Sequence, residues 1–467
     1  MSSSRRRRWI TVVSASFVAL SGASLVPTPA TADGAVIEAI DQRPARIGAA
    51  WLADELERGL LKGQYLDVEG NVVKFADYGL SIDAAFALDA VDRRPKAVAA
   101  ITRAIADHVD SYTTGADFGA PEEVYAGATA KALTLATDQD RNPHRFGSVD
   151  LVDRMEALVL RGAPVGGRIQ DQSAFGDFAN VIGQGYAARG LTAVGSPRAG
   201  KVTRFLLKQQ CDAGWFRLSF TKSLTRNQTC DGRRKSAPDT DATALSVLAL
   251  VEVSKDPASG DRVDKAIEAA VSWLRDRQRR NGALGGGATT EAPNSNSTGL
   301  AGWVFGETGR TAAAKRAATW VRVRQADVAE PCTSQLADQT GAVGYDDAAV
   351  KAGRSDGITD ATTDQWRRAT SQALPALAWA PAGGTASMSA PTGDVAGGSR
   401  PRVTVSGVAP GASVCVTRGS NARATHANRA GNASVRVLMP ERTTTVTVRA
   451  EGADGFLARA TVDVRVR

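Results

Sequence analysis

The sequence contains few of the residues on which metal and nucleophile chemistry depends. It has three histidines and four cysteines in 467 residues, and aromatic residues make up 6% of the chain. His108, His144 and His426 do not lie at a ligand spacing from a cysteine, so we expect no zinc or other metal site and no cofactor. The sequence also lacks a Gly-x-Ser-x-Gly elbow, so no serine-hydrolase arrangement is indicated.

Long apolar runs are scarce as well, and the one that occurs lies near the N-terminus. Arginines at 5–8 precede an apolar run over 9–26 and a small-residue exit at 30–32. This is typical of a secretory signal peptide over 1–32, although the Arg-Arg-Arg-Trp-Ile stretch also permits twin-arginine export. No later segment reaches the roughly 18 apolar residues that a spanning helix needs. We expect an extracellular protein that does not span a membrane and has no anchor or sorting motif.

The cysteines are typical of an oxidising compartment. Cys211 and Cys230 enclose a short loop, and a disulfide between them would stabilise the fold by roughly 3 kcal/mol on the chain-entropy model. The alternative is a pair of unpaired buried thiols. The spacing of Cys332 and Cys415 does not decide whether they pair.

The net charge of +8 is unevenly distributed. From Arg400 onward the chain has eleven arginines and no lysine against four acids, whereas acids slightly outnumber bases over 33–399. Such a tail would be attracted to an anionic surface, such as wall polymers or lipid headgroups, or its arginines would simply keep a small domain soluble. No aromatic residues alternate with these arginines in a binding pattern, so we do not expect nucleic acid as a partner.

The body alternates two kinds of helical segment. Charged amphipathic segments are predicted at 47–61, 95–112, 148–160, 197–210, 262–280 and 312–325. Segments rich in Ala, Leu and Gly are predicted at 79–91, 121–136, 178–191, 240–253, 295–306 and 363–379. A helix with few charges must be buried on most sides, whereas an amphipathic helix needs a partner on one side only. The alternation therefore predicts an inner ring of six helices inside an outer ring of six, an (α/α)6 toroid.

The composition changes after Trp379. The segment 381–400 is rich in Gly, Ala, Ser and Pro, as a linker is. Beyond it, stretches such as VTVSGV and TTTVTVRA alternate apolar and polar residues with a period of two. We therefore predict a mainly α protein with a signal peptide over 1–32, a toroid over 33–380, a linker over 381–400 and a small immunoglobulin-like β-sandwich over 401–467.

The predicted outer helices end in similar text, including RFLLKQQCDAGWFRL, SWLRDRQRRNGALGGG and TWVRVRQ. An aromatic–hydrophobic pair, then Gln and a Gly turn, resembles the repeat of squalene cyclases and protein prenyltransferases (the prenyltransferase/squalene oxidase repeat). In that superfamily the Gln and the aromatic residue tie the end of one outer helix to its neighbour. The resemblance therefore implies scaffold roles for Gln209, Trp215, Trp273, Gln278, Trp320 and Gln325.

Two predicted inner-helix starts, PDTDATALSVLAL and PNSNSTGLAGWVF, extend the resemblance. They are similar to secreted actinobacterial squalene-cyclase-repeat proteins, which are terpenoid cyclase-like toroids, and more distantly to vitamin B12 carriers. The resemblance covers most of 47–379. It implies the toroid fold but not an activity, because such rings include both catalytic and non-catalytic members.

Polar residues gather at the predicted N-terminal ends of the inner helices, which converge on one mouth of a toroid. Our candidates for lining a pocket there are Asp77, Glu122, Glu123, Asp177, Asn180, Gln184, Asp239, Asp241, Asn294 and Asn296. Asp and Asn at helix starts are also expected caps. Asn180 and Gln184 lie one turn apart in an otherwise apolar helix, which capping explains less well, so they are the preferred candidates.

Two enzyme chemistries remain as alternatives. Class II terpene cyclases use an Asp-rich motif, and the matching text here, 239–242, has alanine in place of the third acid. Glycoside hydrolases need two carboxylates across a pocket, which Glu122 or Glu123 with Asp239 or Asp241 could supply. We assign no catalytic residue. The sequence favours a secreted, non-catalytic protein that holds a small molecule or an envelope component; the alternative is an extracellular enzyme, hydrolase- or lyase-like rather than cyclase-like.

Overall fold

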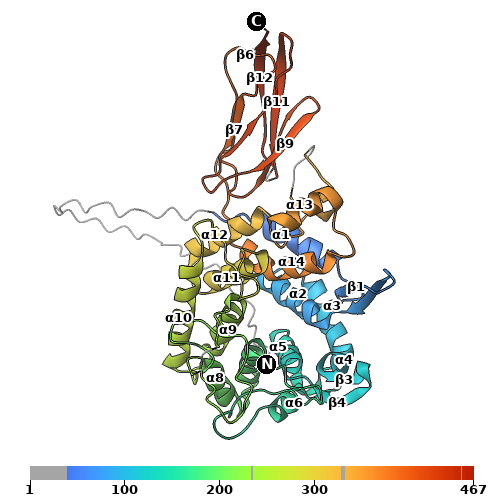
Figure 1. The fold of residues 1–467 in the computed structure, drawn as a ribbon, viewed down its shortest axis with the longest axis vertical. Helices are drawn as coiled ribbons and strands as arrows, with labels where there is room; N and C mark the ends of the chain where they lie inside the picture. Colours follow the sequence, from blue (N-terminus) through green and yellow to red (C-terminus); the bar gives the residue numbers. More distant parts are fainter. Residues whose placement is uncertain (1–38, 233–234, 328–331, 454, 467) are drawn as a thin grey trace, which may run out of the picture. The chain divides into compact units, whose positions relative to one another are not determined.

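The computed structural model describes residues 39–467 apart from 233–234, 328–331, 454 and 467. The predicted signal peptide over 1–32 lies outside the described residues. The described chain forms an α toroid followed by a β domain (Figure 1), which confirms the predicted fold class.

Six helices of the described chain form the inner ring. They are α2 (Tyr78–Ala90), α5 (Ala126–Asp138), α7 (Val181–Ala193), α9 (Thr240–Val253), α11 (Ser295–Glu307) and α14 (Thr363–Leu377). Each packs against the next, and α14 packs against α2, so the ring closes (Figure 1). Because each inner helix is covered both by its ring neighbours and by an outer helix, most of its residues can be apolar or small.

The outer layer consists of amphipathic helices. They are α1 (Arg43–Asp54), α3 (Pro95–Asp107), α4 (Val109–Thr113), α6 (Leu151–Ala157), α8 (Ala199–Leu207), α10 (Asp261–Arg277) and α12 (Thr311–Arg322). Each inner helix is covered by an outer one: α1 contacts α14, α3 contacts α2, α6 contacts α5, α8 contacts α7, α10 contacts α9 and α12 contacts α11. The apolar stripe of each outer helix faces the ring, as at Val263, Ile267 and Leu274 of α10.

Several elements depart from the predicted ones. The inner helix predicted at 121–136 begins at Ala126, because Pro121 lies in β4 (Ala120–Val124), which pairs with β3 (Thr114–Gly115). The outer segment predicted at 95–112 is divided at His108. Helix α13 (Asp347–Asp356) and the hairpin of β1 (Lys62–Leu66) and β2 (Val72–Ala76) were not predicted. Short 3-10 turns lie at Ala116–Phe118, Pro143–Arg145 and Ala337–Gln339.

Four glutamines tie neighbouring parts of the ring together with the same pair of hydrogen bonds. Three of them follow outer helices, and Gln184 lies on the inner helix α7. Gln278 donates from Nε2 to the carbonyls of Gly282 (3.1 Å) and Ala313 of the next outer helix (3.0 Å). Gln210 does the same with Gly214 and Ala266, Gln325 with Gly341 and Pro44, and Gln184 with Gly167 and Val202. Each of these glycines has a positive φ, and a Cβ there would meet a backbone carbonyl of the next outer helix at 2.5 Å or less.

These ties correct one scaffold assignment. Gln278 and Gln325 act as the resemblance implied, but after α8 the tie is made by Gln210 and not by Gln209. Gln209 is also buried, and its Oε1 accepts two hydrogen bonds from Arg217. Both glutamines are therefore structural, with Gln209 serving the following loop.

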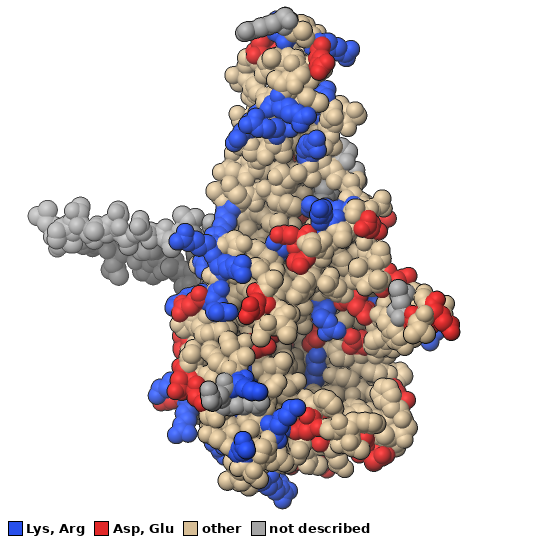
Figure 2. Space-filling model, viewed as in Figure 1, with Lys and Arg blue, Asp and Glu red and all other residues tan. Residues whose placement is uncertain are grey.

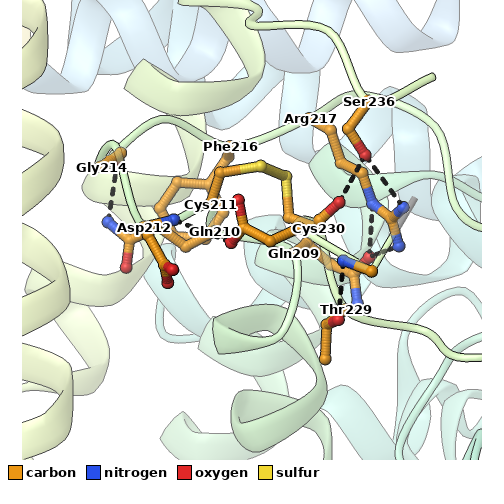
Figure 3. Close-up of a disulfide and its surroundings, with 12 residues drawn as sticks. Gln209, Gln210, Cys211, Asp212, Gly214, Phe216, Arg217, Thr229, Cys230 and Ser236 are labelled. Carbon is orange, nitrogen blue, oxygen red and sulfur yellow. Dashed lines mark hydrogen bonds between the residues drawn. A yellow bond between two sulfur atoms is a disulfide. The ribbon is translucent and has the colours of Figure 1, made fainter. Parts of the chain in front are cut away.

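That loop is held by the predicted disulfide between Cys211 and Cys230 (Figure 3). Arg217 of this loop is buried and donates to Gln209 Oε1 and to the Gln228 carbonyl, both at 2.7 Å. Phe216 N donates to Thr243 Oγ1 of α9 at 2.9 Å. The loop is thus fixed to the first turns of an inner helix.

The β domain contains two sheets. One has the order β10 (Ala433–Arg436), β7 (Arg402–Ser406), β5 (Ser387–Ser389). The other has the order β6 (Val395–Ala396), β12 (Leu457–Arg465), β11 (Thr444–Gly452), β8 (Ser413–Arg418), β9 (Asn421–His426). Val403 and Val405 of the first sheet share one core with Val414, Val448 and Val462 of the second.

Part of the predicted linker belongs to this domain. β5 pairs with β7 and β6 pairs with β12, so 387–389 and 395–396 are strands of the two sheets. Ser387, Met388 and Ser389 alternate polar and apolar residues as a strand does, but this stretch is too short to recognise among the surrounding Gly and Pro residues.

A second disulfide, Cys332–Cys415, joins the chain after α12 to β8. Among the described residues, none of the helices has the length and apolar character that crossing a membrane requires.

Candidate functional site

A cavity of about 220 Å³ lies on the axis of the ring. Every inner helix contributes to its lining, which consists of Asp83, Phe86, Lys131, Ile182, Tyr186, Arg189, Leu245, Leu248, Ala249, Leu300, Trp303, Ser371 and Gln372. Leu245 and Leu248 lie on one face of α9, and Leu300 and Trp303 occupy the equivalent spacing on α11. The wall is therefore largely apolar, with a few polar groups.

The charged groups in the wall are paired. Lys131 Nζ lies 2.7 Å from Asp83 Oδ1 and donates to the Gly79 carbonyl at 2.9 Å. Tyr186 stacks against Phe86 with ring centroids 5.8 Å apart, and burial raises its pKa well above the ordinary value. The phenol therefore stays neutral and can act only as a hydrogen-bonding group.

A second cavity of about 140 Å³ adjoins the first at the C-terminal ends of the inner helices, sharing Phe86, Arg189, Leu248 and Trp303 with it. Its other charged lining residues are all acids, namely Asp89, Asp138, Glu252 and Glu307. Arg189 lies 2.7 Å from Asp138, whose pKa burial raises to about 6 despite the ion pair.

Sequence reasoning missed this acidic end. The signal was present: acids in the last turns of α2, α5, α9 and α11 oppose the helix dipole, so capping cannot explain them. Glu252 is also paired with Lys255, which follows the end of α9. Among the described residues, no three His, Cys, Asp or Glu side chains are close enough together to hold a metal ion.

At the opposite end, the first turns of α9 and α11 lie side by side. Asp239 caps α9 by accepting from Ala242 N at 2.8 Å, and Asn294 caps α11 by accepting from Ser297 N at 2.8 Å. Gly287 approaches Asp239 so closely that a Cβ there would lie 2.4 Å from its Oδ2. The capping roles expected for Asp239 and Asn294 are confirmed.

Asp241 and Asn296 follow these caps and make no capping bonds. Both Oδ1 atoms are buried, and neither has a hydrogen-bond partner among the described residues. Burial raises the pKa of Asp241 to about 6, the nearby Ser297 hydroxyl acts in the opposite direction, and Asp239 adds to the increase. Burial raises the pKa of the nearby Tyr345, and the negative charge of Asp241 raises it further. The sequence analysis listed Asp241 and Asn296 among its candidates but preferred Asn180 and Gln184.

The preference for Asn180 and Gln184 was wrong. Asn180 is the N-cap of α7, and its Oδ1 accepts from Ile182 N and Gly183 N at 3.0 and 3.2 Å. Gln184 is fully buried, and besides its two donated bonds it accepts from Ile169 N at 3.0 Å. Both side chains are satisfied by the scaffold and line neither cavity.

The remaining candidates are dispersed. Asp77 caps α2 through Leu80 N, and Asp177 pairs with Arg168. Glu123 is buried and accepts from Ala174 N at 3.1 Å, whereas Glu122 is exposed on β4. Only Asp241 and Asn296 among the candidates combine burial with an unpartnered oxygen.

Neither a protein-family model nor a curated protein sequence matches the chain. A protein from Actinoplanes, known from its crystal structure, is 16% identical with a TM-score of 0.46 over 72% of this chain and 98% of that one. An unsaturated glucuronyl hydrolase specific for heparin is 10% identical, with a TM-score of 0.48 over 72% and 95%. The type II terpene cyclase MstE from Scytonema is 13% identical, with a TM-score of 0.46 over 72% and 96%. Similarities this low carry no inference about activity.

Proposed function

We propose that the ring is a binding protein that holds a small, largely apolar molecule in its axial cavity, and that it does so outside the cell. The carrying observation is the cavity of about 220 Å³ lined by every inner helix. An engineered apolar cavity of about 150 Å³ binds benzene, so this one accommodates a somewhat larger ligand. Two disulfides favour an oxidising compartment.

A thermal-shift screen of residues 33–467 tests the binding function, using 2-phenylethanol, corrinoids, polyprenyl phosphates and oligosaccharides. Ala249→Phe fills the cavity and should abolish a ligand-dependent rise in Tm, because Ala249 lines the wall. Ala312→Phe, on the exposed face of α12, adds the same ring elsewhere and should leave the rise intact. A rise that survives Ala249→Phe would contradict binding in the axial cavity.

Asp241 favours a second candidate, an enzyme that uses acid–base chemistry on the same ring. A carboxyl group whose pKa lies near 6 can donate a proton close to neutral pH. In glycoside hydrolysis it would protonate the leaving oxygen as the C–O bond breaks, with water supplying the new hydroxyl and Asp239 the nearest second carboxylate.

Mass spectrometry of oligosaccharides and polyprenyl substrates incubated with the protein separates the two candidates. Product formation that disappears in Asp241→Asn would establish the enzyme and overturn the non-catalytic proposal. No product from any substrate, together with a cavity-dependent thermal shift, supports the binding protein.

We further propose that the β domain attaches the protein to an anionic polymer. Its sheets place arginines directly opposite each other, Arg449 opposite Arg459 and Arg402 opposite Arg436, all exposed. Like charges in directly opposed positions destabilise a sheet, so these pairs favour an anionic ligand that lies between them. Basic side chains are prominent on the β domain in Figure 2.

The position of the pairs favours a polymer over a membrane. Val448 and Val403 point into the shared core, so Arg449 and Arg402 face outward from opposite sheets. A flat bilayer reaches one such face at a time, whereas a flexible polymer reaches both. An immunoglobulin-like assignment of this sandwich remains part of the proposal.

Elution from immobilised dextran sulfate tests the attachment. Arg449→Gln with Arg459→Gln should elute at clearly lower salt than the wild type, since the interaction is electrostatic and screened. Arg423→Gln with Arg429→Gln removes the same charge without breaking an opposed pair and should shift elution less. Equal shifts would contradict the opposed-pair site, and retention on anionic vesicles but not on dextran sulfate would contradict the polymer.

A further inference from the structure

Two hydrogen-bond acceptors lie at the N-terminal ends of α9 and α11, one turn beyond residues that line the axial cavity. Asp241 lies one helical turn before Leu245, and Asn296 one turn before Leu300, so both lie on the helix faces whose next turns line the cavity. Their Oδ1 atoms are buried without a partner among the described residues. A buried acceptor without a partner is costly, so this position is suited to a group that donates hydrogen bonds.

The charges along the axis have a negative excess. The linings of the two adjoining cavities contain five acids, Asp83, Asp89, Asp138, Glu252 and Glu307, against two bases, Lys131 and Arg189. Both bases are already paired with acids, Lys131 with Asp83 and Arg189 with Asp138. The walls therefore attract a cation and disfavour an anion.

The N-terminal ends of α9 and α11 are also negative. Among the described residues no basic side chain pairs with Asp241, and the charged group that acts on it is Asp239. The helix dipoles of α9 and α11 each contribute about half a positive charge there. The two carboxylates outweigh both dipoles, so this end of the two helices favours a cation.

We infer that the axial cavity takes a primary ammonium ligand, whose apolar body lies against Leu245, Leu300 and Trp303 and whose ammonium group contacts Asp241 and Asn296. This inference rests on the proposed binding function and adds the chemical class of the ligand. An ammonium group brings three donors and a full positive charge to the two acceptors. An alcohol brings a single donor without charge, and a carboxylate brings no donor.

Three probes with the same phenyl body test the head group at pH 7.5: 2-phenylethylammonium, 2-phenylethanol and phenylacetate. Titration calorimetry should give the ammonium an affinity about tenfold or more above that of the alcohol, since charge-assisted hydrogen bonds are about twice as strong as neutral ones. Phenylacetate should bind least. Ala249→Phe should abolish binding of both the ammonium and the alcohol, because its ring occupies the space of the shared body.

Variants at Asp241 and Asn296 separate the contribution of the head group from that of the cavity. Asp241→Asn and Asn296→Leu should each reduce the ammonium's affinity toward that of the alcohol while leaving the alcohol's affinity nearly unchanged. Glu122→Gln is the matched control, because it removes an exposed carboxylate on β4, away from α9 and α11. It should leave the preference for ammonium intact.

The preference should also depend on pH. Burial raises the pKa of Asp241 to about 6, so the preference should be present at pH 7.5 and decline as the pH falls through that value. The other titratable groups facing Asp241 are Asp239 and the phenol of Tyr345, whose pKa is raised, so Tyr345 stays neutral throughout.

The outcomes distinguish failure of the ammonium site from failure of the binding function itself. If the ammonium binds no better than the alcohol while Ala249→Phe blocks the alcohol, the ammonium site is overturned and the cavity stands. If none of the probes binds, both are overturned. If phenylacetate binds most tightly, the ammonium site is overturned in favour of anion binding at Lys131 and Arg189.

Discussion

The buried carboxyl of Asp241 makes the stability of the protein depend on pH. An unfolded Asp has a pKa of about 3.9, whereas burial raises the folded value to about 6. Between these values the folded state binds more protons, so the free energy of unfolding decreases as the pH rises through this window. The cost of the charge is almost absent at pH 4 and complete above the folded pKa.

Asp241→Asn should therefore stabilise the protein at pH 7.5 by roughly 1–3 kcal/mol, and this gain should nearly vanish at pH 4. Urea unfolding of the wild type and the variant at both pH values measures the difference. Glu122→Gln, at an exposed position, should show no such dependence. A gain that does not change with pH would contradict a buried, ionised carboxyl at this position.

Individual polar residues show what a sequence reveals at this scale. Asp239 and Asn294 could be predicted as caps, because capping is local and depends on the three residues that follow. The same expectation for Asp177 was wrong, since Asn180 caps α7 and Asp177 pairs with Arg168. Gln184 could not be assigned correctly, because its partners at Gly167 and Val202 come from two other segments. Asp241 and Asn296 stand out only when the caps beside them are seen to take up the free backbone groups.

At the scale of helices, close packing in the inner ring depends on glycine. A Cβ on Gly299 of α11 would lie 2.4 Å from Ala373 Cα and 2.6 Å from the Gln372 carbonyl of α14. Gly127, in the first turn of α5, has no atom within 4 Å of an added Cβ. The same substitution at these two positions should therefore have opposite effects.

Gly299→Ala should destabilise the ring by about 1–3 kcal/mol or more, because two helix backbones must separate. Gly127→Ala should be neutral or stabilise by up to about 1 kcal/mol, because alanine restricts the unfolded chain. Melting temperatures of the two variants provide the comparison. Similar decreases in both would mean that α11 and α14 do not approach each other as closely as described.

The type and order of the helices could be predicted because charge content separates inner from outer segments. Their boundaries could not, where local chemistry prevailed over periodicity, as at Pro121 in β4. The β1–β2 hairpin gave no helical signal, and its tie to α14, Gln64 N to Asp364 Oδ2 at 3.0 Å, joins residues 300 apart. No pattern within a short window contains that contact.

At the scale of the whole molecule, the Cys332–Cys415 disulfide links the β domain to the ring across 83 residues. On the chain-entropy model a loop of this length is stabilised by roughly 4–5 kcal/mol, against roughly 3 kcal/mol for the Cys211–Cys230 loop. The Cys332–Cys415 bond links the ring and the β domain, whereas the Cys211–Cys230 bond constrains one loop of the ring.

Replacing Cys332 and Cys415 with serine should lower the melting transition of the β domain relative to that of the ring, because the domain loses its covalent tie. Replacing Cys211 and Cys230 should instead lower the transition of the ring. Scanning calorimetry of the two double variants distinguishes these effects. Identical thermograms for the two variants would contradict separate roles for the disulfides.

The seam between the first and last helices of the ring has a topological consequence. Gln325 binds the Pro44 carbonyl just as Gln278 binds that of Ala313, and the Ala382 amide donates to the Ala39 carbonyl at 2.8 Å. The junction where the ring closes on itself is thus built like the junctions inside it. The contacts do not mark any helix of the ring as the first. The helices follow one another in a circle, and the chain begins and ends this circle at one of several similar junctions.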